Sequence, residues 1–151
     1  NREVWKAMED LQTQGKIRSI GVSNFLPHHM DALLETARVL PAVNQIRLAP
    51  GVFQEEVVDY CRQKGILLEA WGPFGHEIVL ALAEKYGVSP AQILLAWSLA
   101  EGFLPLPKSV TPKRIADNLA CFDIHLSQED GDLLRHLPVE AGAPDPDAKD
   151  F

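Results

Sequence analysis

Residues 104–118 read LPLPKSVTPKRIADN, and this stretch indicates how the rest of the chain is organised. A short apolar segment leads into Lys108 and Ser109. Thr111 and Pro112 then favour the start of a helix, because threonine is a good N-cap and proline fits the first helical turn. Lys108, Lys113 and Arg114 therefore gather at a helix N-terminus, where free N–H groups and the helix dipole favour anions. The pattern predicts either a phosphate site or an ordinary capped helix exposed to solvent.

Short apolar segments typical of strands alternate along the chain with amphipathic segments typical of helices. Strands are expected at residues 17–22, 43–46, 67–71 and 103–107, and each is followed by a helix. Gly65 is placed as a helix C-cap, and Ser89 with Gln92 forms a capping box that opens a helix. This alternation predicts an α/β fold with a parallel sheet and right-handed crossovers.

The spacing of these units resembles the repeating unit of an eight-fold β/α barrel, and four units are half of a barrel. An open half would expose two strand edges and an apolar inner face. We therefore expect residues 1–151 to be the C-terminal half of a single TIM (β/α)8 barrel, supplying roughly strands five to eight. An N-terminal half is expected in the same or a second chain. Residues 141–151 are expected to form an irregular tail.

Composition excludes several functional classes. The net charge of −7 argues against binding to nucleic acid, which requires a basic face. The two cysteines, Cys61 and Cys121, lie among apolar neighbours and are expected to be reduced. Neither a signal peptide nor an apolar span of about 20 residues is present, so we expect a cytoplasmic protein without membrane contact. The chain does not begin with Met, which indicates a fragment.

Residues suited to ligand binding stand at the end of each predicted strand, which is where barrels build their active sites. They are Ser23, Asn24, Gln45, Trp71, Gly72, Lys108 and Ser109. Serine, asparagine and glutamine suit a carboxamide, tryptophan offers a face for a flat ring, and the basic residues with Arg114 suit a phosphate. Taken singly, each could be a local backbone cap or a core residue. Together they indicate a nicotinamide dinucleotide.

Other polar residues have simpler interpretations. His28 and His29 are expected to face solvent, and no metal site is expected. The adjacent carboxylates are expected on solvated surfaces, and Tyr60 and Tyr86 are expected to be packing residues. These carboxylate pairs are Glu9-Asp10, Glu55-Glu56 and Glu129-Asp130. The chain offers no convincing general acid, so no catalytic residue is assigned within it.

Four motifs at the strand ends together resemble the C-terminal half of an aldo-keto reductase. They are Gly21-Val-Ser-Asn-Phe25, Pro41-Ala-Val-Asn-Gln45, Glu69-Ala-Trp-Gly-Pro73 and Pro107-Lys-Ser-Val-Thr-Pro112, the last followed by Arg114-Ile115 and Asn118. The stretch Ala143-Pro-Asp-Pro-Asp147 resembles the branch that contains 2,5-diketogluconate reductases and microbial prostaglandin F synthases.

The resemblance implies a (β/α)8 barrel that binds NADPH in an extended pose without a Rossmann fold. It implies that Ser23, Asn24 and Gln45 hold the nicotinamide carboxamide and that Trp71 stacks on the ring. The implied contacts to the rest of the cofactor form a longer list: Gly72, Phe74 and Gly75 at the pyrophosphate, Lys108, Ser109 and Arg114 at the 2′-phosphate with Val110 and Thr111 in the same segment, and Asp117 and Asn118 at the adenine.

This sequence also departs from the family pattern. The family's catalytic Asp, Tyr, Lys and His belong to the N-terminal half, and no motif in this chain matches them. Gly72 stands where serine is common, and Asp117 stands where glutamate is common. Residues 47–49 differ from the usual Glu-x-His, and the segment between Phe74 and Ile78 is shorter than the usual loop over the cofactor.

The resemblance implies NADPH-dependent reduction of aldehydes or ketones to alcohols, with this chain carrying the cofactor-binding half. The isolated 151-residue chain is then expected to be inactive. One alternative is a non-catalytic half-barrel that binds a nucleotide or a partner. Another is a different phosphate-using barrel such as an isomerase, which Trp71 and the carboxamide-binding side chains disfavour.

Overall fold

The computed structural model describes residues 1–72, 77–138 and 147. Its internal contacts divide the chain into two compact units. The first unit comprises residues 1–46, 54–68 and 144–151, and the second comprises residues 47–53 and 69–143.

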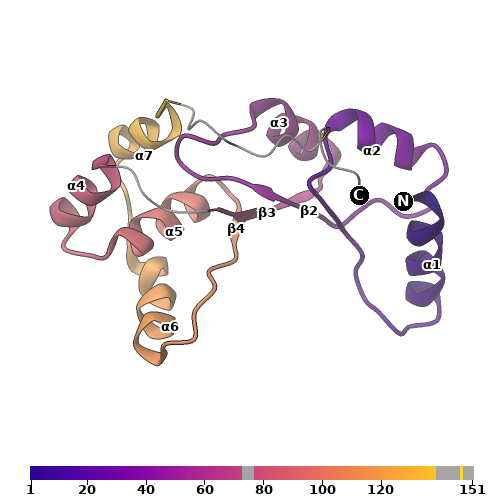
Figure 1. The fold of residues 1–151 in the computed structure, drawn as a ribbon, viewed down its shortest axis with the longest axis horizontal. Coiled ribbons are helices and arrows are strands. Elements are labelled where there is room, and N and C mark those ends of the chain that lie inside the picture. The colour runs from indigo at the N-terminus through magenta and orange to yellow at the C-terminus, as the bar shows by residue number, and fades with distance from the viewer. Residues whose placement is uncertain (73–76, 139–146, 148–151) are drawn as a thin grey trace. The chain divides into compact units, whose positions relative to one another are not determined.

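The first unit contains three helices and a parallel strand pair (Figure 1). Its elements are α1 (Arg2–Thr13), β1 (Val22–Ser23), α2 (Pro27–Leu34), α3 (Glu55–Lys64) and most of β2 (Val43–Arg47). Val22 is paired with Asn44, and Ser23 is paired with Gln45. The core of this unit forms where Trp5, Ile20 and Leu33 pack together, all at most 5% exposed.

Close approach of β1 and β2 depends on Gly21. A Cβ atom at this position would lie 2.3 Å from Val43 Cγ2 and 2.9 Å from the Val43 carbonyl oxygen. Both distances are well below van der Waals contact, so any side chain at position 21 would clash with Val43 unless the backbone shifts.

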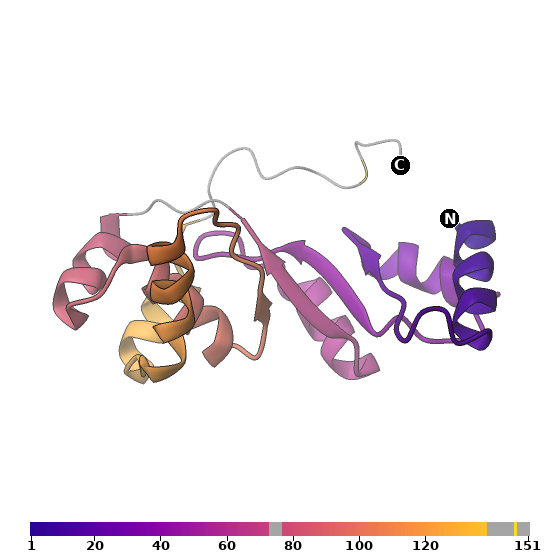
Figure 2. The same ribbon diagram turned by 90° about the horizontal axis from the view of Figure 1, so that it is seen from below.

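The second unit contains four α-helices, a short 3-10 helix and a second parallel strand pair. Its elements are α4 (Glu77–Tyr86), α5 (Pro90–Ala100), β4 (Leu104–Pro105), α6 (Pro112–Leu119), η1 (Ala120–Asp123), α7 (Gln128–Arg135) and most of β3 (Leu67–Trp71). Helix α5 lies among α4, α6 and α7 (Figure 2). Residues Ile93 to Ser98 are all buried, as expected of a helix that is apolar nearly all round.

The predicted alternation of strands and helices along the chain is confirmed, and both strand pairs, β1 with β2 and β3 with β4, are parallel. Local signals placed the helix ends correctly. Gly65 has a left-handed conformation at the end of α3, and Ser89 and Gln92 form the predicted capping box of α5. Helix α2 begins at Pro27 and ends at Leu34.

Two predicted strands are wrong in length. The first was expected at residues 17–22, but ladder pairing covers only Val22–Ser23. The last was expected at residues 103–107, but β4 covers only Leu104–Pro105. Pro105 is paired with Ala70, and the Leu106 N–H donates to the Ala70 carbonyl over 3.1 Å just beyond the end of β4.

Large apolar side chains on β3 and at β4 remain exposed in the described part of the chain. Leu67 on β3 is 44% exposed, and Leu104 and Leu106 at β4 are 42% and 45% exposed. Alternate residues of β3, Leu68 and Ala70, are buried. Leu67 and the buried pair therefore lie on opposite faces of β3.

No single helix among the described residues is long and apolar enough to cross a membrane. Helices α4 and α5 reach the required length and composition only when they are counted together, and they are bent by 93° at the break between them.

Candidate functional site

The structure brings together the three residues that were predicted to hold a carboxamide. Ser23 Oγ donates a hydrogen bond of 3.0 Å to the Gln45 carbonyl oxygen, and the Asn24 N–H donates one of 2.9 Å to the same oxygen. Asn24 Nδ2 donates to Ser23 Oγ over 3.2 Å. Ser23 ends β1 and Asn24 follows it, whereas Gln45 lies in the middle of β2; Asn24 and Gln45 are half-buried.

Asn24 adopts a backbone conformation that is uncommon for residues other than glycine. Its φ is 58°, and no other non-glycine residue in the described part of the chain has a positive φ. Asparagine tolerates this left-handed region better than most residues do. Backbone strain held in place by surrounding hydrogen bonds is a common property of functional sites.

Asn44 supports this segment, although the sequence analysis did not single it out. Its side chain is fully buried. Nδ2 donates to the Phe25 carbonyl over 2.8 Å, and Oδ1 accepts from the Phe25 N–H over 3.3 Å. Side chains alternate along a strand, so Asn44 and Gln45 point to opposite faces of β2. The Asn44 side chain is on the buried face, where a polar group requires hydrogen-bond partners. That alternation was the signal available in the sequence.

In the second unit, Trp71 and Gly72 share a pocket of about 370 Å³ with Lys108. The sequence places these residues at the ends of two different strands, and the structure confirms that they come together. A Cβ atom on Gly72 would lie 3.5 Å from Ala49 Cβ and from Arg47 Cγ, which is ordinary contact. Phe74 and Gly75, which were also predicted to contact the cofactor, lie outside the described residues.

A neighbouring pocket of about 510 Å³ gathers the predicted phosphate and adenine residues. Those that line it are Lys108, Ser109, Arg114, Asp117 and Asn118, together with Lys113 and the start of α5. The two remaining predicted members of the segment, Val110 and Thr111, do not line it, and Val110 is 89% exposed.

The charges in this pocket favour an anion. Lys108, Lys113 and Arg114 face a single carboxylate, Asp117, whose Oδ2 lies 2.6 Å from Lys113 Nζ. Within the described residues, neither Lys108 nor Arg114 has an ion pair. Thr111 is the N-cap residue of α6, but its side chain makes no capping hydrogen bond and its N–H donates to Ser109 Oγ over 3.3 Å.

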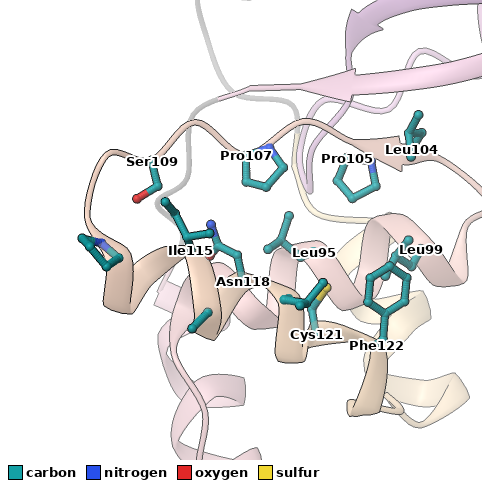
Figure 3. Close-up of a pocket in the computed structure, with 13 residues that line it drawn as sticks. Leu95, Leu99, Leu104, Pro105, Pro107, Ser109, Ile115, Asn118, Cys121 and Phe122 are labelled. Atoms are coloured by element: carbon teal, nitrogen blue, oxygen red, sulfur yellow. The ribbon is translucent and has the colours of Figure 1, made fainter.

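An apolar hollow of about 580 Å³ adjoins this basic pocket and shares Ser109 and Asn118 with it (Figure 3). Pro105 and Pro107 form one wall, and Leu95 and Ile115 lie across from them on two helices (Figure 3). The side chains around Ser109 therefore change from cationic to apolar over a short distance.

Two carboxylates that were expected on solvated surfaces are buried, so this prediction was wrong for Glu9 and Asp130. Glu9 Oε1 accepts hydrogen bonds from the Arg38 N–H over 2.6 Å and from the Val39 N–H over 2.8 Å. Burial alone would raise the pKa of Glu9, but these bonds and the Arg38 guanidinium outweigh burial and lower it. Glu55 and Glu56 are exposed, as predicted.

The two tyrosines do more than pack, which corrects their sequence-based interpretation. Tyr60 Oη donates to Asp31 Oδ1 over 2.5 Å, and Tyr86 Oη donates to Asp130 Oδ2 over 2.5 Å. Burial, followed by the hydrogen bond to Asp31, raises the pKa of Tyr60 to about 12. Both hydroxyls thus link helices in the described structure.

His28 and His29 form a hydrogen-bonded group with Asp147. The Nε2 atoms of the two histidines lie 3.0 and 3.1 Å from Asp147 Oδ1. His29 Nδ1 accepts the Leu26 N–H over 3.2 Å. His28 is exposed, as predicted, whereas His29 is half-buried.

The chain matches known proteins over nearly its whole length. The model of the aldo/keto reductase family matches residues 1–81 and 76–137. Glyoxal reductase of Bacillus subtilis is 43% identical over 153 residues, a match that covers 97% of this chain and 55% of the relative. Methylglyoxal reductase DkgA of Escherichia coli is 38% identical, with 96% of this chain and 56% of the relative covered.

Solved structures agree with the sequence matches. A variant of Gox0644 in complex with NADPH is 34% identical and superposes with a TM-score of 0.92, covering 99% of this chain and 58% of that protein. These relatives are (β/α)8 barrels, and this chain supplies part of that parallel α/β architecture. It spans about half the length of the curated relatives it matches. The extent of these matches shows that the chain belongs to the aldo/keto reductase family.

Proposed function

We propose that this chain supplies the cofactor-binding half of an oxidoreductase that reduces aldehydes or ketones to alcohols with NADPH. The relatives named above are reductases of glyoxal and methylglyoxal, and one solved relative holds NADPH. Residues 1–151 would form the C-terminal half of one barrel domain, with residues 141–151 as its tail.

The observation that carries the proposal is the pocket that gathers Lys108, Ser109, Arg114 and Asn118. Cationic side chains and a helix N-terminus suit the 2′-phosphate that distinguishes NADPH from NADH, and an arginine can bind it through two parallel hydrogen bonds. Serine and asparagine supply neutral hydrogen-bonding groups beside those cations. The residues present therefore fit the adenosine end of the cofactor.

The remaining predicted residues suit the nicotinamide end. Trp71 offers a stacking face, and Ser23, Asn24 and Gln45 offer the donors and acceptors that a carboxamide requires. When bound, the cofactor supplies the hydride. The residues of this chain would orient the ring so that one face is presented to the carbonyl carbon.

A proton must also reach the carbonyl oxygen, and we propose that a tyrosine in the N-terminal half of the barrel donates it. The exposed leucines of β3 and β4, at 42–45% exposure, support such a half as the partner of this chain. A small carbonyl compound is the proposed substrate. Either the same chain or a second one would carry the N-terminal half.

The test measures the affinity of the full-length protein for NADPH and for NADH by fluorescence titration. Arg114→Ala removes a charged hydrogen-bond donor, so we expect a roughly tenfold or larger loss of NADPH affinity with little effect on NADH. Arg18→Ala removes an exposed arginine that does not line the pocket and serves as the matched control. Unchanged NADPH affinity in the Arg114 variant would show that the phosphate assignment is wrong.

Carbonyl reduction by the same preparation separates the two leading functions. NADPH consumption with glyoxal or methylglyoxal supports the reductase. Tight NADPH binding without any carbonyl reduction supports the alternative, a non-catalytic module that retains the nucleotide site.

A further inference from the structure

One wall of the basic pocket is an ion pair between two residues, Lys113 and Asp117, to which the proposed function above gives no contact with the phosphate. Lys113 Nζ lies 2.6 Å from Asp117 Oδ2, one helical turn further along α6. Both residues line the pocket together with Lys108 and Arg114. The pair therefore lies beside the proposed phosphate position rather than on a remote surface.

This pair is weak and easily broken. The Lys113 side chain is 82% exposed and that of Asp117 is 39% exposed. Exposed ion pairs contribute little to stability, and a basic residue placed before its acidic partner is the less favourable order on a helix. Lys113 can therefore leave Asp117 at small cost when a stronger anion arrives.

Lys113 also stands where a helix disfavours a cation. It follows Pro112, the first residue of α6, and the first turn of this helix contains no acidic residue. The positive end of the helix dipole repels Lys113 and Arg114, so their placement opposes the stability of the free protein. A dianionic phosphate bound at this point would relieve that repulsion. The exposed ion pair with Asp117 offsets this repulsion only weakly, and such a departure from a local rule is expected at a site that serves a ligand.

We propose that Lys113 is a third cation of the phosphate pocket, held by Asp117 in the free protein and transferred to the cofactor phosphate on binding. Asp117 is then a positioning residue whose carboxylate competes with the phosphate. This differs from the resemblance, which placed Asp117 at the adenine. The inference rests on the proposed function, because it requires a phosphate in this pocket.

The experiment compares NADPH and NADH affinities of the full-length protein by fluorescence titration. Lys113→Met should weaken NADPH binding about two- to fivefold, the size expected of one partly exposed charge, and leave NADH binding unchanged. Asp117→Asn should strengthen NADPH binding by a similar factor. Both effects should shrink in 1 M salt, because exposed charges are then screened within about 3 Å. Lys16→Met, another exposed lysine that does not line the pocket, is the control.

The double variant separates positioning from simple repulsion. If Asp117 acts by holding Lys113, the gain from Asp117→Asn should fall by at least half in the Lys113→Met background. An undiminished gain would overturn the positioning role, and an unchanged NADPH affinity in Lys113→Met would overturn the proposal as a whole. If Arg114→Ala also leaves NADPH binding unchanged, the proposed function itself fails. If Arg114→Ala weakens NADPH binding but the Lys113 and Asp117 variants bind NADPH as the parent does, the proposed function stands and this inference alone fails. Thermal unfolding of each variant without cofactor confirms that it is folded.

Discussion

The Tyr86 hydroxyl donates a hydrogen bond of 2.5 Å to the Asp130 carboxylate and accepts one of 2.9 Å from the Ser127 N–H. Lys85 Nζ lies 2.8 Å from the same carboxylate. This cluster joins the end of α4 to the start of α7. Asp130 is only 5% exposed, yet Lys85, Ser127 and Tyr86 hold its pKa at about 2.

Replacing Asp130 with asparagine should destabilise the protein by about 2–3 kcal/mol, because hydrogen bonds to a buried charge are stronger than neutral ones. The side chain keeps its shape, but Lys85 loses its counter-charge. Urea unfolding at neutral pH measures the loss. Asp132→Asn, on the exposed side of the same helix, should stay within about 0.5 kcal/mol of the parent. Equal losses of unfolding free energy in the two variants would show that the buried cluster adds no stability beyond that of an exposed aspartate.

The same cluster predicts a dependence of stability on acid. The pKa of Asp130 is lowered from 3.8 to about 2 in the folded protein, so the folded state favours the ionised form. Its contribution is fully present above about pH 4 and is lost as the pH falls through about 2. The difference in urea midpoint between the parent and Asp130→Asn should therefore be constant from pH 5 to 7 and shrink below pH 4. A difference that persists unchanged at pH 2 would contradict the lowered pKa.

Sequence patterns predicted what depends on neighbours along the chain. Gly65 and the Ser89–Gln92 capping box are local signals, and both helix ends formed as predicted. The burial of Glu9 could not be predicted in this way, because its partners Arg38 and Val39 lie 29 and 30 residues further along the chain. The lengths of β1 and β4 could not be predicted either, because a strand extends only as far as it pairs with a partner strand that is distant in the sequence.

Much of the candidate site could be predicted from strand ends alone. Parallel strands carry their C-terminal residues to one edge, so Ser23, Asn24 and Gln45 were expected to meet, and they do. The i,i+4 spacing of Lys113 and Asp117 is a local signal for their ion pair, whereas the resemblance implies only an adenine contact for Asp117. Side-chain alternation on β2 is the sequence signal for the buried, supporting position of Asn44.

A substitution at Gly21 should show how tightly β1 approaches β2. Gly21→Ala places a Cβ atom 2.3 Å from Val43 Cγ2, so we expect a loss of about 1–3 kcal/mol, typical of overpacking. Val43→Ala removes the clashing methyl group and should recover part of that loss, while the contact with the Val43 carbonyl remains. Unfolding of the two single variants and the double variant measures the coupling. If the losses of unfolding free energy in the two single variants simply add in the double variant, the Val43 methyl group is not the source of the strain.

Gly131→Ala should have the opposite effect. This glycine lies within α7, and an added Cβ atom would meet nothing within 4 Å. Alanine is the better helix former because it loses less backbone entropy on folding, so stability should rise by about 0.5–1 kcal/mol. A higher thermal midpoint with an unchanged circular dichroism spectrum is the expected result. A lower midpoint would mean that the space beside Gly131 is occupied in solution.

Asn24 allows backbone strain and cofactor contact to be separated. Its φ of 58° is easily adopted by glycine, so Asn24→Gly should keep the parent's stability or raise it by up to about 1 kcal/mol. Asn24→Ala keeps the strain without the compensating hydrogen bond to Ser23 Oγ, and should cost about 1–2 kcal/mol. Both variants lack the side-chain amide that is proposed to hold the nicotinamide carboxamide.

They should therefore lose affinity for NADPH and NADH by the same factor, because the two cofactors share the nicotinamide end. Arg114→Ala should instead affect NADPH alone. Titration of each variant with both cofactors, alongside urea unfolding, gives the comparison. An Asn24→Gly variant that is stable and binds both cofactors as tightly as the parent would assign Asn24 a purely structural role. A loss confined to NADPH would place Asn24 at the phosphate end and contradict the proposed orientation of the cofactor.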